Sequence, residues 1–197
     1  MRLFIAINFT AEFKDGIWDI MTRLREHALE GRFTRYQNLH LTLQFLGETD
    51  RVRHIFEAME EAAREEWQRD EGAGAPLDAA SQSKDVFSIE PFVIKTAGLG
   101  KFRRRGGDIY WLGLERSAPL EDLQALLARA LTRRGFQLEE RPFRPHLTLG
   151  REVRVEEGFD EEAFSRRLPR LSMEVNRISL MESSNRGGKL TYTEIRP

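Results

Sequence analysis

The sequence contains no cysteine. A disulfide framework, a thiolate nucleophile and a sulfur-ligated metal are therefore excluded. Long apolar runs are missing too, because the apolar N-terminal stretch, residues 1–9, is far too short to span a membrane. That stretch also lacks the small-residue cleavage site of a signal peptide. We therefore expect a cytoplasmic protein that does not act on a membrane.

A dominant charge of one sign is lacking as well. The 197 residues include 31 lysines and arginines and 32 aspartates and glutamates, which gives a formal net charge of −1. The whole molecule should therefore not attract polyanions, and any contact with nucleic acid must come from a local basic surface. Hydrophobic residues make up 40% and charged residues 32% of the chain, which is typical of a folded globular protein.

Histidine is scarce, and its placement is the most informative feature of the chain. Two of the four histidines begin the same word, His40-Leu41-Thr42-Leu43 and His146-Leu147-Thr148-Leu149, and each copy lies in an apolar run. Successive side chains of a β-strand point to opposite faces. The histidine and the threonine of each word should therefore share one face of a strand, with the two leucines on the other face.

Strand and helix patterns alternate in both halves of the chain. Periodicity, capping residues and turn signals predict strands at residues 2–9, 38–47, 92–95, 109–114, 136–140, 146–149, 171–182 and 190–195, and helices at about 11–30, 50–63, 119–134 and 161–168. Each half contains helices and one His-Leu-Thr-Leu strand. We therefore expect an α+β fold of two pseudo-symmetric lobes, each an antiparallel sheet with outer helices, which enclose a central cleft carrying both words.

The length suits one good core or two small lobes that share one, so we expect a single bilobal domain over residues 1–197. The pattern breaks at residues 64–90, where a charged segment leads into the loop signal Gly72–Pro76. Residues 64–90 are therefore predicted to be a variable polar connection. The tract Lys101–Gly107 is predicted to be an exposed basic turn between strands.

Two histidines facing one cleft supply what the hydrolysis of a phosphodiester requires. Neutral imidazole takes a proton from water, imidazolium donates one to the leaving oxygen, and an ordinary pKa of about 6.5 lets both forms exist near neutral pH. Each proton transfer typically contributes about 10²–10⁴ in rate, so positioning and charge stabilisation must supply the remainder. Thr42 and Thr148 are well placed to hydrogen-bond phosphate oxygens.

A metal site is the main chemical alternative, and it lacks ligands. Neither His–Thr pair forms a full site, and no neighbouring histidine or aspartate cluster completes one, so we expect no metal and no other cofactor. A lone histidine in an apolar strand is usually structural, but two copies with the same spacing and the same partner favour a function. His27 and His54 have no such context and are expected at the surface.

With these motifs the sequence resembles the two-histidine phosphoesterase superfamily, which is defined by two His-x-Thr-x motifs. More narrowly, it resembles the RNA 2′,3′-cyclic phosphodiesterase branch, historically called 2′-5′ RNA ligases. The resemblance covers nearly the whole chain. It rests on the opening strand Arg2–Ile7, the two motif segments Asn38–Glu48 and Arg141–Arg151, the strand Tyr110–Leu114, and the ending from Leu180 to Tyr192.

The resemblance implies metal-independent hydrolysis of an RNA terminal 2′,3′-cyclic phosphate to a 2′-phosphomonoester. His146 would act as the base that activates water and His40 as the acid that protonates the departing 3′ oxygen. Thr42 and Thr148 would hold the phosphate oxygens. The branch also has functional residues five positions after each histidine. Here these are Phe45 and Arg151, which would stack on the terminal base, and the arginine would also meet phosphate.

Two further functions stay open at this point. The same groups can catalyse the reverse reaction, ligation of 2′,3′-cyclic and 5′-hydroxyl RNA ends, and a catalytically idle module that binds RNA or a nucleotide is the other alternative. For Phe45, a core aromatic that closes a strand is the competing interpretation. Arg103–Arg105 is a candidate contact for upstream phosphates. We expect RNA ends or small cyclic nucleotides as partners, no obligate protein partner, and a monomer.

Overall fold

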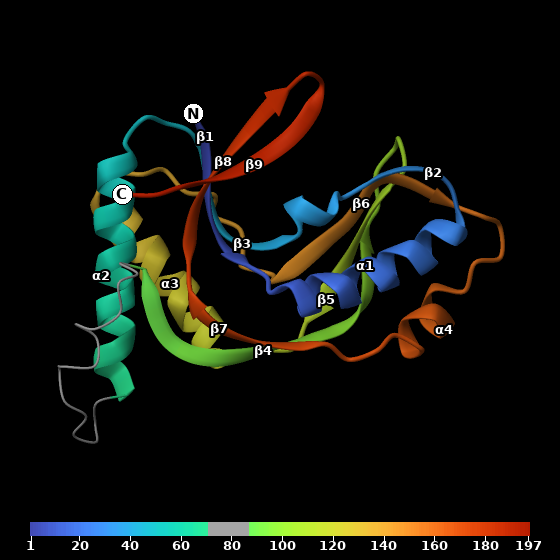
Figure 1. The fold of residues 1–197 in the computed structure, drawn as a ribbon, viewed down its shortest axis with the longest axis horizontal. Helices are drawn as coiled ribbons and strands as arrows, with labels where there is room; N and C mark the ends of the chain where they lie inside the picture. The colour runs from blue at the N-terminus through green and yellow to red at the C-terminus, as the bar shows by residue number, and fades with distance from the viewer. Residues whose placement is uncertain (71–86) are drawn as a thin grey trace.

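The computed structural model describes residues 1–70 and 87–197 (Figure 1). The helices of this part are α1 (Ala11–Glu26), α2 (Val52–Asp70), α3 (Ala118–Arg133) and α4 (Glu161–Arg166), with a short 3-10 helix η1 (Tyr36–Asn38). The strands are β1 (Arg2–Asn8), β2 (Ala28–Phe33), β3 (His40–Glu48), β4 (Ser88–Phe102), β5 (Asp108–Leu114), β6 (His146–Val155), β7 (Ser172–Arg177), β8 (Ser179–Arg186) and β9 (Lys189–Ile195). No helix in the described ranges combines the length and apolar character that a membrane span needs.

The strands form two antiparallel sheets. Sheet A has the order β3-β1-β8-β9, and sheet B has the order β2-β6-β5-β4-β7. When β2 is set aside, both sheets begin with a strand that carries a His-Leu-Thr-Leu word, β3 in sheet A and β6 in sheet B. Each of these strands then pairs antiparallel with β1 or β5, respectively. The expected α+β fold of two similar lobes is therefore confirmed.

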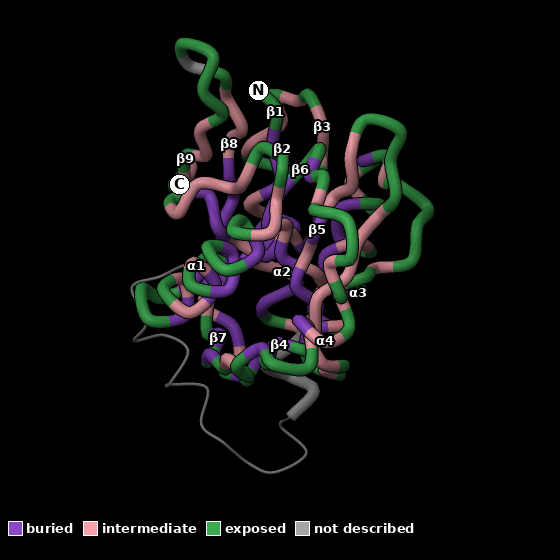
Figure 2. Tube along the Cα trace, turned by 90° about the vertical axis from the view of Figure 1, so that its right-hand side faces the viewer, coloured by how far each residue is buried: buried purple, intermediate pink, exposed green. Residues whose placement is uncertain are grey.

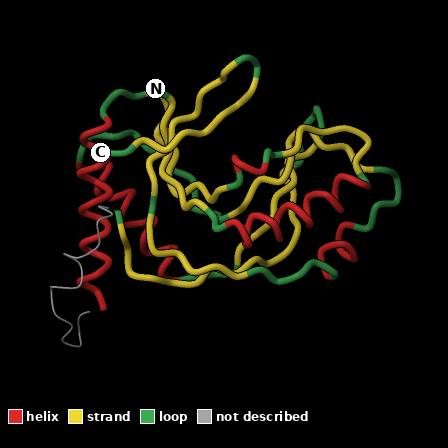
Figure 3. Tube along the Cα trace, in the orientation of Figure 1, coloured by secondary structure: helices red, strands yellow, loops and turns green. Residues whose placement is uncertain are grey.

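The helices cover the sheets in two groups. In Figure 1, α2 and α3 lie together on one side of the molecule, while α1 and α4 lie on the other, and Figure 3 shows the strands running between the two groups. The buried residues, purple in Figure 2, gather on the strands and on the inner sides of the helices. Almost all of the buried side chains belong to a single hydrophobic cluster that includes both sheets, so the two lobes share one core.

The first helix illustrates how the local sequence produces these elements. α1 begins after the N-cap Thr10, whose hydroxyl accepts a hydrogen bond from the backbone N–H of Phe13 at 3.3 Å. Its buried residues recur at helical spacing, as the sequence predicts: Phe13, Ile17, Ile20, Met21 and Leu24. Burial of this apolar stripe against the sheet stabilises the helix more than its intrinsic propensity does.

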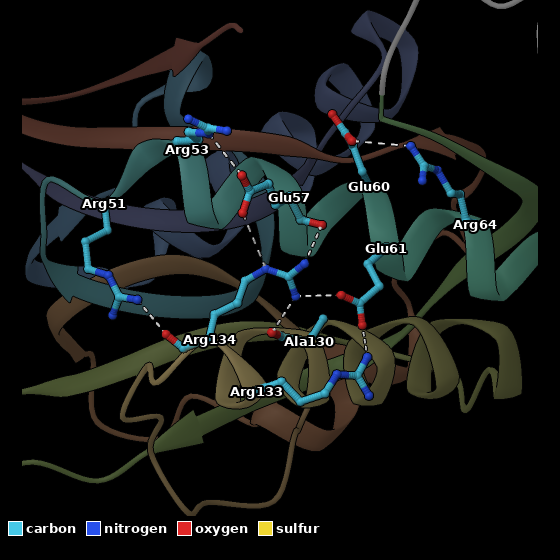
Figure 4. Close-up of polar contacts among 9 residues, drawn as sticks. All are labelled: Arg51, Arg53, Glu57, Glu60, Glu61, Arg64, Ala130, Arg133 and Arg134. Carbon is cyan, nitrogen blue, oxygen red and sulfur yellow. Dashed lines mark hydrogen bonds and ion pairs between the residues drawn. The ribbon is translucent and has the colours of Figure 1, made fainter.

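An ion-pair network joins α2 to α3 (Figure 4). The guanidinium of Arg134 donates to the Glu61 carboxylate at 2.6 Å and to the backbone carbonyls of Ala130 and Glu57 at 3.0 and 3.3 Å. Arg133 also pairs with Glu61. Because Arg134 and Glu61 are only 22% and 29% exposed, this network lies partly out of water and holds the two helices in one relative position.

Two predictions were wrong, one at the end of the first helix and one at the strand predicted over residues 171–182. The helix predicted to reach Gly31 ends at Glu26, and residues 28–33 form β2, which pairs with β6. The helical spacing continues past residue 26, but pairing with a distant strand overrides it. The strand predicted at 171–182 is two strands, β7 and β8, which belong to different sheets. A continuous run of strand-forming residues gives no sign of this crossing between sheets.

The middle of the chain also differs from the prediction. The predicted strand at 136–140 does not form, and β4 is much longer than 92–95, because it continues through Gly98 and Gly100. Gly100 does not end the strand, because the absence of a side chain there leaves room for the Trp111 ring. In the predicted connection at 64–90, residues 64–70 continue α2 and β4 starts at Ser88. Most of that predicted connection, residues 71–86, lies outside the described residues.

Candidate active site

The two His-Leu-Thr-Leu words occupy the starts of β3 and β6, and their side chains alternate as predicted. The leucines are buried at 0–3% exposure and belong to the core: Leu41, Leu43, Leu147 and Leu149. The histidine and threonine of each word lie on the opposite face and are half-buried. The structure therefore presents one His/Thr pair on each sheet, at equivalent strand positions.

Both imidazole rings are held in the same way. His40 Nδ1 lies 2.7 Å from the carbonyl oxygen of Asn38, and His146 Nδ1 lies 2.7 Å from the carbonyl oxygen of Arg144. Because a carbonyl only accepts, Nδ1 carries the proton in each neutral ring, and Nε2 is left as the basic nitrogen. The Thr42 hydroxyl lies 2.9 Å from His40 Nε2 and donates to it when the ring is neutral. A carbonyl two residues upstream thus sets the tautomer in both half-sites.

Aromatic residues enclose both imidazoles. The ring centroids of Phe4 and Tyr192 lie 4.9 and 5.0 Å from that of His40. These two side chains form a small apolar cluster on the cleft face of sheet A, opposite the main core. On sheet B, the rings of Phe102 and Trp111 lie 5.4 and 6.1 Å from His146. The packing limits the motion of each imidazole and lowers the local dielectric constant.

The electrostatic surroundings of His40 favour its neutral form. Burial is the main cause that lowers the pKa of His40 below 6.5, and the positive charges of Lys14 and Arg151 lower it further, against the raising effect of the Asn38 carbonyl. Lys14 comes from α1 and is itself half-buried, which lowers its own pKa. The sequence does not predict this role of Lys14, because a lysine on an amphipathic helix usually projects into solvent.

A β-bulge in each word strand decides which later residues face the cleft. In the β1–β3 pair, Ala6 is opposite Thr42 and Ile5 is opposite Gln44, so Leu43 has no partner. In the β5–β6 pair, Leu149 is skipped in the same way. A bulge places an extra residue in one strand and reverses the alternation beyond it. Each bulged leucine occupies the same position in its word.

The bulges bring the fifth residue after each histidine onto the cleft face. Phe45 is opposite Phe4, whose ring packs against His40, while Gln44 faces the core and accepts a hydrogen bond from Gln124 at 3.2 Å. Paired residues on antiparallel strands share a face. Regular alternation would have placed Phe45 with the buried leucines. On sheet B, Gly150 pairs with the buried Tyr110, so the following Arg151 lies on the cleft side.

Phe45 and Arg151 are both accessible. Phe45 is 38% exposed, with the Arg2 guanidinium 5.0 Å from its ring centroid, so the core-aromatic interpretation of Phe45 is wrong. Arg151 is exposed, and its charge lowers the pKa of both His40 and Tyr192, although burial raises the pKa of Tyr192 overall. The charge of a residue on sheet B therefore reaches the half-site on sheet A.

The other residues considered from the sequence lie elsewhere. His27 is 2.6 Å from Glu156 and packs against Phe159, and His54 is exposed on α2, both away from these half-sites. Arg103–Arg105 lies in the exposed turn between β4 and β5. This turn directly follows Phe102, whose ring packs against His146. Within residues 1–70 and 87–197, no group of three or more histidine, aspartate and glutamate side chains is arranged to hold a metal ion.

Comparison with known proteins gives a consistent result. A model of the 2′-5′ RNA ligase superfamily matches residues 13–187. A Thermotoga maritima protein named RNA 2′,3′-cyclic phosphodiesterase is 29% identical over 185 residues, which cover 93% of this chain and 87% of that protein. A Geobacillus stearothermophilus protein with the same name is 31% identical over 86% of this chain and 47% of its own length.

Solved structures agree with these sequence matches. E. coli LigT complexed with 3′-AMP superposes with a TM-score of 0.68 at 26% identity, covering 99% of this chain and 95% of that one. Thermus thermophilus TT0787 has a TM-score of 0.68 at 20% identity over 100% of this chain and 96% of its own, which supports the fold alone.

Proposed function

Because the chain belongs to the 2′-5′ RNA ligase superfamily, we propose that it hydrolyses the terminal 2′,3′-cyclic phosphate of RNA to a 2′-phosphomonoester. The observation that carries the proposal is the pair of imidazoles, held through Nδ1 by carbonyls in the same way and presenting Nε2. The relatives named RNA 2′,3′-cyclic phosphodiesterase support this substrate. A binding module has no need for two imidazoles prepared alike.

In the proposed reaction, one histidine takes a proton and the other gives one. His146 Nε2 accepts a proton from water, whose oxygen attacks phosphorus, while the bond from phosphorus to the 3′ oxygen breaks. His40 donates its Nε2 proton to that oxygen, and the phosphate stays on the 2′ oxygen. We propose that no metal takes part, since side chains supply the proton transfers and the positive charge that the transition state requires.

The lowered pKa of His40 places a condition on its role as the acid. In the free protein, burial and the nearby cations favour the neutral ring, which has no Nε2 proton to donate. A bound phosphodiester brings a negative charge next to the ring, and such a charge raises the pKa of a histidine. His40 therefore gains the Nε2 proton that it donates when the substrate binds.

Four residues are proposed to hold the substrate. Thr42 and Thr148 hydrogen-bond the phosphate oxygens from the two words, and Arg151 contributes a positive charge beside His40. The exposed Phe45, which is opposite Phe4 in the β1–β3 pair, stacks on the terminal base.

Incubation of the protein with an oligonucleotide ending in a 2′,3′-cyclic phosphate, in the presence of a chelator, tests the activity. We expect a 2′-phosphate product from the wild type, and a loss of about 10²–10⁴ in kcat for His40→Ala and for His146→Ala. Binding without turnover would refute the enzymatic function. Activity that returns only with added metal would refute the metal-free mechanism, and a joined product with a 5′-hydroxyl RNA would reveal ligation.

A substrate in which sulfur replaces the bridging 3′ oxygen tests the roles of the two histidines. A thiolate leaves without a proton, so the general acid matters less for this substrate. We expect His40→Ala to recover most of its lost rate on the sulfur substrate, while His146→Ala remains impaired on both substrates. Recovery by His146→Ala instead would reverse the assignment.

A further inference from the structure

A pocket of about 720 Å³ adjoins the His146 half-site. Its lining includes the end of β5, the middle of β4, the start of α3 and the segment that leads into β6. Pro145 directly precedes His146, and Gly113 is paired with His146 across the β5–β6 ladder. The pocket therefore lies next to His146, and its volume is in the range of ligand-binding pockets.

The walls suit a nucleotide. Trp111 and Phe143 provide aromatic surface, the Gln124 amide provides a polar group for a base edge, and Arg144 adds a positive charge. Trp111 is fixed in place, because its ring lies over Gly100, where a Cβ atom would come within 2.2 Å of it. A fixed indole is a suitable stacking surface since it loses little conformational entropy on binding.

The positive charge of this lining is available to a ligand. The carbonyl of Arg144 holds His146 Nδ1, but its side chain is exposed and forms no ion pair within the described ranges. The other arginine of the pocket, Arg116, is occupied by Glu121 at 3.3 and 3.4 Å. Arg144 is thus the pocket residue suited to a phosphodiester.

The stereochemistry of the substrate indicates which nucleotide enters. The cyclic phosphate spans the 2′ and 3′ carbons of the terminal ribose, with the base on the 1′ carbon to one side and the 5′-linked chain on the 4′ carbon to the other. Phe45, proposed to stack on the terminal base, lies on sheet A, and the pocket lies on sheet B next to His146. Because Phe45 is assigned to the terminal base, the pocket is left for the nucleotide joined through the 5′ carbon, which is the upstream RNA.

We propose that this pocket binds the nucleotide immediately 5′ to the cyclic end, with its base between Trp111 and Phe143 and its linking phosphate at Arg144. The inference rests on the proposed function and adds a preference for oligonucleotides over cyclic mononucleotides. The terminal base itself is the competing occupant.

The test compares two substrates, adenosine 2′,3′-cyclic phosphate and a diadenosine that ends in a 2′,3′-cyclic phosphate. For the wild type we expect kcat/KM to be about tenfold higher for the dinucleotide, the gain that one stacked base typically provides. Phe143→Ala and Arg144→Ala should each reduce the ratio of the two kcat/KM values by about fivefold or more. Arg141→Ala is the matched control, because Arg141 is an exposed arginine of the same segment that does not line the pocket.

An unchanged ratio in both pocket variants would overturn the inference, and so would an equal loss on the two substrates, which would place the terminal base in the pocket. Calorimetric binding of a diadenosine 3′-phosphate and of adenosine 3′-phosphate separates this subsite from the catalytic proposal. Tighter binding of the dinucleotide, lost in Arg144→Ala, supports the subsite even without turnover. Equal affinities would refute it even in an active enzyme.

Discussion

At the scale of single residues, the two histidines share a tether but differ in their surroundings. Each Nδ1 is bound to a carbonyl two residues upstream, yet burial and the charges of Lys14 and Arg151 lower the pKa of His40. The proton affinity of His40 is therefore set by its tertiary neighbours as well as by the carbonyl that holds it. The lowered pKa has a measurable effect on stability.

The first prediction concerns the pH dependence of folding. Between the lowered pKa of folded His40 and the ordinary value of about 6.5, the unfolded state binds more protons than the folded state. The contribution of this histidine to stability is therefore present above pH 6.5 and is lost as the pH falls through that window. Relative to His40→Gln, which does not titrate, the wild type should gain stability between about pH 5 and pH 7.5.

Denaturant unfolding of both proteins at several pH values provides the measurement. Each unit of pKa displacement corresponds to about 1.4 kcal/mol. A difference in unfolding free energy that stays constant from pH 5 to pH 7.5 would contradict the lowered pKa. His40→Asn serves as a second non-titrating variant that separates the titration from a packing effect.

The sequence was sufficient to predict the two His/Thr pairs, because their arrangement depends only on the alternation of a strand. It did not predict the residues that surround them. Phe4, Tyr192 and Trp111 reach the histidines from strands that are neighbours only in the folded sheets. Their aromatic side chains look like ordinary core residues in the sequence, and only strand pairing distinguishes them.

At the scale of elements, β4 and β5 pack closely because Gly100 on β4 has no side chain. An ideal Cβ on Gly100 would lie 2.2–2.6 Å from three atoms of the Trp111 ring. Gly100→Ala must therefore displace the indole, and we expect a loss of about 1–3 kcal/mol in unfolding free energy. Catalytic activity should fall as well, because Trp111 packs near His146.

Gly106→Ala is the matched control for this prediction. An added Cβ at Gly106 meets nothing within 4 Å, so the change in unfolding free energy should stay within about 0.5 kcal/mol. Thermal or denaturant unfolding of the two variants checks the contrast. Equal stabilities would show that Trp111 is free to move away from Gly100.

The contact between α2 and α3 provides another prediction at this scale (Figure 4). Arg134 is 22% exposed and bonds to Glu61 and to two carbonyls, whereas Arg53 is 90% exposed and pairs with Glu57 one turn away. Arg134→Ala should lower the unfolding free energy by about 1–3 kcal/mol, because it leaves partly buried acceptors unsatisfied. Arg53→Ala should cost less than about 0.5 kcal/mol.

Chemical denaturation at low and high salt measures both effects. Neither arginine is among the residues proposed for the site, so activity at a temperature well below unfolding should be retained in both variants. Similar losses for the two arginines would contradict the partly buried network as the source of the stability.

Element prediction succeeded where one local pattern was sufficient and failed where tertiary pairing decided. Helix α3 begins and ends within a residue of the predicted range, because its apolar stripe is unambiguous. Strand β2 was predicted as helix, since only its pairing with β6 makes it extended. The division of residues 172–186 into β7 and β8 depends on two sheets, neither of which is visible in the local sequence.

At the scale of the whole molecule, one proposed site is assembled from two lobes. Each sheet contributes one His/Thr pair, and Arg151 acts across the two sheets on His40. If the histidines work in one concerted step, their contributions cannot be independent. Groups that act as a unit show strongly non-additive effects when they are removed.

The double variant His40→Ala/His146→Ala tests this coupling. We expect its loss in kcat/KM to be close to that of the worse single variant, rather than the product of the two losses. Steady-state kinetics of all four proteins on a cyclic mononucleotide provides the measurement, and circular dichroism confirms that each variant is folded. Losses that multiply would indicate two independent steps.

The paired bulges change how the motif strands are to be read. A regular strand has two reading frames, one for each face, and residues an even number apart belong to the same frame. Leu43 and Leu149 act as single-residue frameshifts, so the residue five positions after each histidine returns to the frame of that histidine. An odd interval between two residues that serve one cleft is thus itself a sign of a bulge. Deleting Leu43 would place Gln44 in the core-facing position of the lost leucine and leave Phe45, then four positions after His40, on the cleft side without a bulge.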